Sequence, residues 1–160
     1  MHDADGLRRA FALARRARAN GNPPFGAVLV DGHGAVVLEA ENTATSERDC
    51  TGHAETNLIR DASRRFGVLS AYTMYTSAEP CCMCAGAAFW GGLGRIVFGL
   101  SAQRLAGLRG DGGPPMLDLS CRDVIARGQR AIAVVGPLLE DEAAALFADR
   151  QPDSSPPDNS

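Results

Sequence analysis

The chain has 160 residues, a formal charge of −3 and five cysteines, and all 16 of its basic residues are arginine. The absence of lysine excludes a Schiff base on a lysine amine and a Walker A phosphate site. The slightly acidic balance argues against a general nucleic-acid binder, and the odd number of cysteines argues against a closed disulfide framework. We therefore expect a soluble cytoplasmic protein, where cysteines more often bind metal or catalyse.

The hydrophobic pattern predicts one compact domain over residues 1–150 and a disordered tail over 151–160. The tail contains only Gln, Pro, Asp, Ser and Asn, which cannot bury apolar surface. No apolar run approaches the ~20 residues of a membrane span, and residues 1–6 lack the basic and apolar regions of a signal peptide. We therefore expect no membrane partner.

In chain order, the first predicted element is a helix over residues 4–19, where apolar side chains recur at helical spacing. A nearly all-apolar strand over 25–30, typical of burial on both faces, follows. The turn at 31–34 joins it to a strand over 35–41, so we expect a hairpin. A polar loop then leads into a helix over 53–66.

The second half of the chain alternates strands with helices. Three more strands are predicted, over residues 72–77, 95–100 and 131–135. Three more helices are predicted, starting at Pro80, at a Ser120 cap with Asp123, and at the acidic residues 140–142. This order predicts an α/β fold of three layers, with a five-stranded mixed sheet between helices on both faces.

Two short segments carry residues with metal-binding spacing: HAE at 53–55 and PCCMC at 80–84. Cys81 and Cys84 are three residues apart at a predicted helix start, so they share a face where the helix N-terminus stabilises thiolates. With His53 they form a Cys₂His set, which leaves the fourth zinc position open to water. Glu55 lies about 200° around a helix from His53, which favours a proton-shuttling carboxylate over a fourth ligand. Cys82 is expected to point away from the metal.

The combination of H-x-E with P-C-x-x-C is a signature of zinc deaminases, and the chain resembles the cytidine deaminase superfamily over residues 22–100. Four other segments carry the resemblance: PFGAV at 24–28, ENT at 41–43, YTS at 75–77 and AGA at 85–87. Within the superfamily the chain is most similar to the branch that holds guanine deaminase, tRNA adenosine deaminase and fungal cytosine deaminase.

This resemblance implies one zinc ion per chain and a hydrolytic deamination. Zinc-activated hydroxide would attack the ring carbon that bears the amine, and Glu55 would move protons to the ring and to the departing ammonia. The resemblance also implies that Asn42 hydrogen-bonds the base, that Phe25 packs near the ring, and that the backbone N–H of Ala54 contacts the substrate. A Phe-Trp pair ending at Trp90 is similar to a pair in guanine deaminases, which makes Trp90 a candidate substrate contact.

We therefore expect a small-molecule substrate, namely a free nucleobase, nucleoside or related amino-heterocycle, with guanine favoured and cytosine or adenine as alternatives. The resemblance also implies a homodimer. A tRNA adenosine deaminase is the first alternative, but such enzymes carry basic residues where this chain has residues 89–92 and an acidic last helix. A zinc-stabilised interaction domain without catalysis is the second. The arginines of the first helix are expected to form a solvated face.

Overall fold

The computed structural model describes residues 1–110 and 113–148, so the predicted tail lies outside the described residues. Five strands form one mixed sheet in the order β2-β1-β3-β4-β5. β1 (Gly26–Val30) is antiparallel to both β2 (Val36–Glu41) and β3 (Thr73–Ala78). β4 (Arg95–Leu100) and β5 (Ala133–Val135) continue the sheet parallel to β3. Every residue of β1 is buried, as its apolar run predicts.

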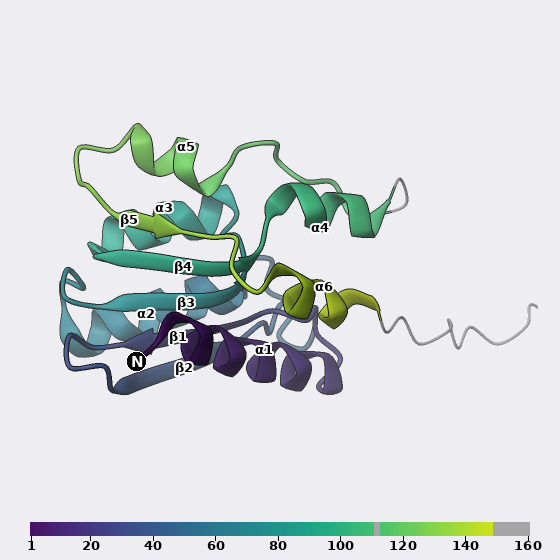
Figure 1. Cartoon of the computed structure of the whole chain (residues 1–160), viewed down its shortest axis with the longest axis horizontal. Coiled ribbons are helices and arrows are strands. Elements are labelled where there is room, and N and C mark those ends of the chain that lie inside the picture. Colours follow the sequence, from purple (N-terminus) through teal and green to yellow (C-terminus); the bar gives the residue numbers. More distant parts are fainter. Residues whose placement is uncertain (111–112, 149–160) are drawn as a thin grey trace, which may run out of the picture.

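Helices cover both faces of this sheet (Figure 1). α1 (Asp3–Ala19) and α6 (Glu140–Ala148) pack on one face. On the other face, α2 (Ala54–Phe66) and α3 (Cys82–Gly91) lie side by side, and the short α5 (Cys121–Ala126) packs on α3. The predicted three-layer α/β architecture is confirmed.

One helix, α4 (Ala102–Arg109), was not predicted. Its only buried residue is Leu105, so no apolar stripe marks it in the sequence. The N-terminus of α4 is instead defined by polar contacts, because the Ser101 hydroxyl accepts the N–H of Arg104. The last strand is also shorter than predicted, since β5 pairs with β4 only from Ala133 onward.

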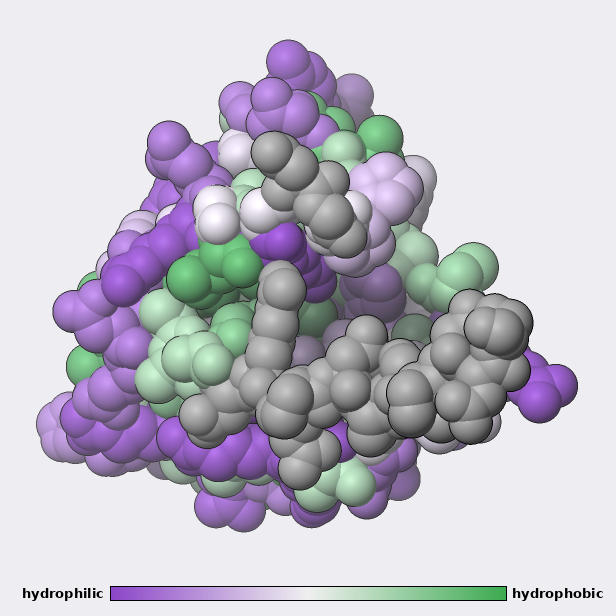
Figure 2. All heavy atoms as spheres, turned by 90° about the vertical axis from the view of Figure 1, so that its right-hand side faces the viewer, coloured by the Kyte–Doolittle hydropathy of each residue, from purple (hydrophilic) through white to green (hydrophobic). Residues whose placement is uncertain are grey.

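The ends of several elements meet at one edge of the sheet, on the right of Figure 1. β3 and β4 end together there, with Ala78 paired to Leu100, and β2 ends beside the first residue of β1. α2 and α3 begin at this edge. Carboxyl ends of parallel strands are where open α/β sheets bind ligands. Figure 2 faces this end, which is hollowed and has both hydrophobic and hydrophilic walls.

Within the described residues, no helix is both long and apolar enough to cross a bilayer.

The N-terminal end of α1 is fixed to the sheet by Asp3 and Gly6. Arg95 donates two hydrogen bonds of 2.7 Å to the Asp3 carboxylate, and the Tyr75 hydroxyl donates another of 3.1 Å. Gly6 lies directly on the Tyr75 ring, where an added Cβ would sit 2.6 Å from ring carbons. The absence of a side chain at Gly6 therefore lets α1 pack this closely.

Gly6→Ala is expected to lower the free energy of unfolding by about 1–3 kcal/mol, because overpacking outweighs the better helix propensity of alanine. Gly107→Ala in α4 is the matched control, since no heavy atom lies within 4 Å of its added Cβ. That control should stabilise the protein by up to about 1 kcal/mol. Urea unfolding measures both effects. A Gly6→Ala protein as stable as the wild type would contradict this packing.

Candidate active site

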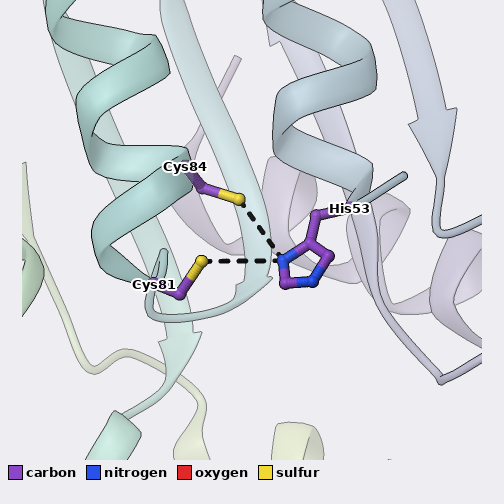
Figure 3. A group of neighbouring side chains, drawn as sticks. All are labelled: His53, Cys81 and Cys84. Carbon is purple, nitrogen blue, oxygen red and sulfur yellow. Dashed lines mark hydrogen bonds between the residues drawn. The ribbon is translucent and has the colours of Figure 1, made fainter. Parts of the chain in front are cut away.

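His53, Cys81 and Cys84 converge between the N-termini of α2 and α3 (Figure 3). The Nδ1 atom of His53 lies 3.6 Å from the Sγ atom of each cysteine, and the three donor atoms all lie within 4.8 Å of one another. One imidazole nitrogen and two thiol sulfurs form a donor set that suits zinc. Among the described residues this group has three members, so a zinc ion held there would keep one position open.

The start of each helix explains why these side chains meet. His53 is the N-cap of α2 and Cys81 is the N-cap of α3, and neither side chain caps its own helix. Both side chains are therefore available to a metal, at the positive ends of two helix dipoles. A hydrogen bond from Cys84 lowers the pKa of Cys81 to about 4, and the contact with His53 lowers it further. The pKa of Cys84 is raised because its thiol donates to Cys81.

Glu55 lies beside the three donor atoms and is only 4% exposed. The Thr76 hydroxyl donates to Oε1 at 2.9 Å, and the Cys84 thiol lies 3.6 Å from Oε2. Burial raises the pKa of Glu55, and the hydrogen bond from Thr76 opposes this increase. The protonated form is thus more favoured than it is for an exposed glutamate. A carboxyl in this position can exchange protons with groups bound next to the metal donors.

The structure brings Phe25, Asn42 and Ala54 to the same edge. The backbone N–H of Asn42 donates to the carbonyl of Phe25 at 3.0 Å, which fixes these two residues side by side. Asn42 is 2% exposed, and its Oδ1 accepts the N–H of Ala44. Ala54 is the first residue of α2, directly between His53 and Glu55.

Trp90 is not brought to this site. It lies nine residues after Cys81, about 13 Å along the axis of α3, and is 85% exposed. Its ring meets the edge of Phe89 with centroids 5.5 Å apart. The similarity of this aromatic pair to one in guanine deaminases favoured guanine as the substrate. In the structure, however, Trp90 lies far from the metal-donor atoms of its own chain.

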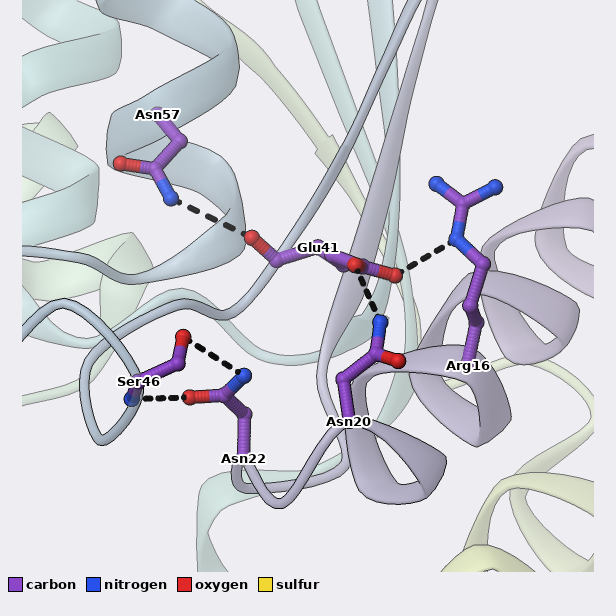
Figure 4. A network of polar contacts seen from close by, with 6 residues as sticks. All are labelled: Arg16, Asn20, Asn22, Glu41, Ser46 and Asn57. Atoms are coloured by element: carbon purple, nitrogen blue, oxygen red, sulfur yellow. Dashed lines mark hydrogen bonds and ion pairs between the residues drawn. The ribbon is translucent and has the colours of Figure 1, made fainter.

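Two buried asparagines that the sequence analysis missed hold the segment that follows Asn42 (Figure 4). The amide of Asn57 donates to the carbonyl of Glu41 at 3.2 Å and to the Thr43 hydroxyl at 3.1 Å. Asn22 accepts the N–H groups of residues 45 and 46. No sequence pattern marked these residues, because their partners are mostly backbone atoms.

Glu79 and Arg109 were also missed. Glu79 accepts the first N–H of α4 and the first N–H of α5, each at 3.0 Å, and so ties both helices to the metal-binding segment. Arg109, the last residue of α4, lies with its guanidinium carbon 5.7 Å from the centroid of the Phe25 ring. The ring of Phe147, from α6, lies 5.5 Å from Phe25.

Cys84→Ser is expected to lower the zinc content from about one ion per chain toward zero, because a hydroxyl is a much poorer zinc ligand than a thiolate. Cys82→Ser is the matched control, since Cys82 is adjacent in sequence but outside the donor group. Elemental analysis of the dialysed proteins gives both ratios. Equal zinc loss in the two variants would contradict this ligand set.

Known proteins resemble this chain in sequence and in fold. Residues 1–100 match the model of the cytidine and deoxycytidylate deaminase zinc-binding region. A protein of Schizosaccharomyces pombe described as a probable cytosine deaminase is 41% identical over 138 residues, which cover 86% of this chain and 85% of the relative. A tRNA-specific adenosine deaminase of Haemophilus influenzae is 39% identical over 98 residues, covering 59% of this chain and 56% of the relative.

The solved structure of a guanine deaminase from Nitrosomonas europaea superposes with a TM-score of 0.73 and 27% identity, covering 89% of this chain and 81% of the other. The family model covers more than half of the chain, and the yeast relative matches along most of both chains. The chain therefore belongs to the cytidine and deoxycytidylate deaminase family of zinc-dependent enzymes.

Proposed function

We propose that the chain hydrolytically deaminates a free nucleobase, nucleoside or related amino-heterocycle, with guanine favoured and cytosine or adenine as alternatives. The observation that carries this proposal is the buried Glu55 carboxyl, which lies 3.6 Å from Cys84 in a three-donor metal site. A zinc ion that only stabilises an interaction domain does not need a buried carboxyl beside its ligands. The Nitrosomonas guanine deaminase supports guanine, whereas the position of Trp90 does not.

Each site residue has a role in this proposal. His53, Cys81 and Cys84 would hold the zinc ion, whose chemical contribution when bound would be to polarise water and lower its pKa. Glu55 would move two protons in turn, and because Thr76 holds Oε1, Oε2 is the atom that carries them. It would take the first proton from the attacking water and pass it to the ring nitrogen, and then take the second proton of that water and pass it to the departing amine.

The remaining residues orient the base. Ala54 opens α2, where backbone N–H groups have no partner within the helix, so its N–H is suited to donate to a ring oxygen. Phe25, at the same edge, would pack near the ring of the base. Asn42 uses its Oδ1 in the turn to Ala44, so its amide N–H₂ is the group we assign to the base.

The tRNA alternative receives little support from the basic helix α1. Arg8 and Arg16 form ion pairs with Glu142 and Glu41, and Arg9 pairs with Glu39. The glutamates thus compensate the positive charges of these arginines, which RNA phosphates would otherwise bind. Deamination of tRNA is therefore one of the outcomes that the substrate test below distinguishes.

Ammonia release from a panel of free bases, nucleosides and aminotriazines, with a tRNA anticodon stem-loop as comparator, tests the proposal. The wild type should release ammonia from at least one small heterocycle. Glu55→Gln should keep its zinc and lose at least a hundredfold in kcat, because it cannot take up the proton. Glu142→Gln is the matched control, since Glu142 is exposed on α6 and should leave kcat unchanged.

Activity confined to the stem-loop would replace this proposal with tRNA deamination. A wild-type protein that binds zinc but releases no ammonia from any of these compounds would show an interaction domain instead. Near-normal turnover by Glu55→Gln would remove Glu55 from the mechanism.

We also propose a single domain over residues 1–150, a homodimer and a cytoplasmic location. Sedimentation equilibrium tests the homodimer directly, because the monomer has a mass of 16.8 kDa.

A further inference from the structure

We propose that Arg109 determines substrate specificity by donating hydrogen bonds to a carbonyl oxygen on the ring of the base. The enzyme would thereby favour heterocycles that carry both an amino and an oxo group, such as guanine and cytosine, over those that lack the oxo group. This inference rests on the proposed deamination of small heterocycles and names the class of base that the site selects.

The position of Arg109 carries the inference. Its guanidinium carbon lies 5.7 Å from the centroid of the Phe25 ring, within cation–π range. Phe25 is joined to Asn42 by a backbone hydrogen bond, and both residues lie at the edge of the sheet where the metal donors meet. Arg109 therefore lies against one of the residues that we place beside the base.

The fold fixes α4 in this position. Glu79 accepts the N–H of Ala102 at the start of α4, and Glu79 lies two residues before the zinc ligand Cys81. The far end of α4 also favours a cation, because Arg109 occupies the last residue, where the helix dipole is negative. The helix that carries Arg109 is therefore attached to the metal-binding segment rather than to a remote part of the surface.

The chemistry of the guanidinium determines which bases it can select. The guanidinium has five N–H donors and no acceptor. It can therefore donate a hydrogen bond to a ring oxygen, but it cannot accept one from an amino group. Guanine and cytosine carry a ring carbonyl, whereas adenine and 2-aminopurine do not. Arg109 is only partly exposed, so its guanidinium lies partly out of water, where a hydrogen bond to it is stronger.

The experiment compares guanine with 2-aminopurine, which has the same ring and the same amine but no oxo group. Cytosine and 4-aminopyrimidine form a second pair. The readout is the ratio of kcat/KM for the oxo base to kcat/KM for its analogue. Arg109→Gln should lower this ratio about tenfold to a hundredfold, which is the effect expected when a hydrogen bond to a charged group is lost. The value of kcat/KM for the analogue without the oxo group should stay within about threefold of wild type.

Arg104→Gln is the matched control, because Arg104 lies on the same helix but pairs with Glu140 and Asp141 of α6. It should leave the ratio unchanged. Arg109→Lys should restore part of the preference, since lysine keeps the charge but lacks the planar fork. Calorimetric binding of each pair to Glu55→Gln protein, with and without Arg109→Gln, measures the same preference independently of turnover.

The inference is overturned if the wild type shows no preference for the oxo base in either pair, or if Arg109→Gln lowers binding and turnover of both members equally. It is also overturned if Arg104→Gln has the same effect, because packing of α4 would then be the cause. A wild type that binds oxo bases through Arg109 but releases no ammonia would refute the proposed function and leave this inference standing.

Discussion

The N-termini of α2 and α3 lie side by side at one edge of the sheet, and their N-cap residues point toward one another. This arrangement places one imidazole nitrogen and two thiol sulfurs within 4.8 Å of one another, a donor set that suits zinc. The helix dipoles favour thiolates at that point, and the packing of α2 on α3 holds the two segments together. The same geometry buries Glu55, because it occupies the first turn of α2 on the side that faces β3 and Thr76. The metal-binding group and the carboxyl that we propose as proton carrier therefore both result from the pairing of α2 with α3.

Local patterns in the sequence were sufficient to predict this part of the molecule. The apolar run that becomes β1, the hairpin, the proline that precedes α3 and the spacing of Cys81 and Cys84 each depend on residues close together in the chain. The mixed five-stranded sheet and its two helical layers followed from the order of those elements, and both are confirmed. The family match over residues 1–100 covers the same region. The boundaries of β5 and the existence of α4 did not follow, because a three-residue edge strand and a helix with one buried residue leave almost no periodic signal.

Contacts between distant residues account for what the sequence could not predict at the site. Asn57 holds the segment after β2 by backbone acceptors, so its role depends on where the chain passes and not on a motif. Glu79 joins α4 and α5 to the metal-binding segment, and Arg109 reaches Phe25 from 84 positions away in sequence. Trp90 illustrates the opposite case, since its position beside a strong motif suggested a substrate contact, whereas one helix length separates it from the donor atoms. The candidate metal ligands of this chain thus follow from local spacing, whereas the residues that we propose select the substrate lie on elements that only the fold brings together.

X-ray absorption at the zinc K edge of the purified protein tests the central claim most directly, because it counts the atoms that bind the metal. Three protein ligands with one open position predict two sulfur atoms at about 2.3 Å and two lighter atoms at about 2.0 Å, one from His53 and one from water. A first shell of three or four sulfur atoms, or one filled entirely by protein groups, would contradict a catalytic site and indicate a structural zinc.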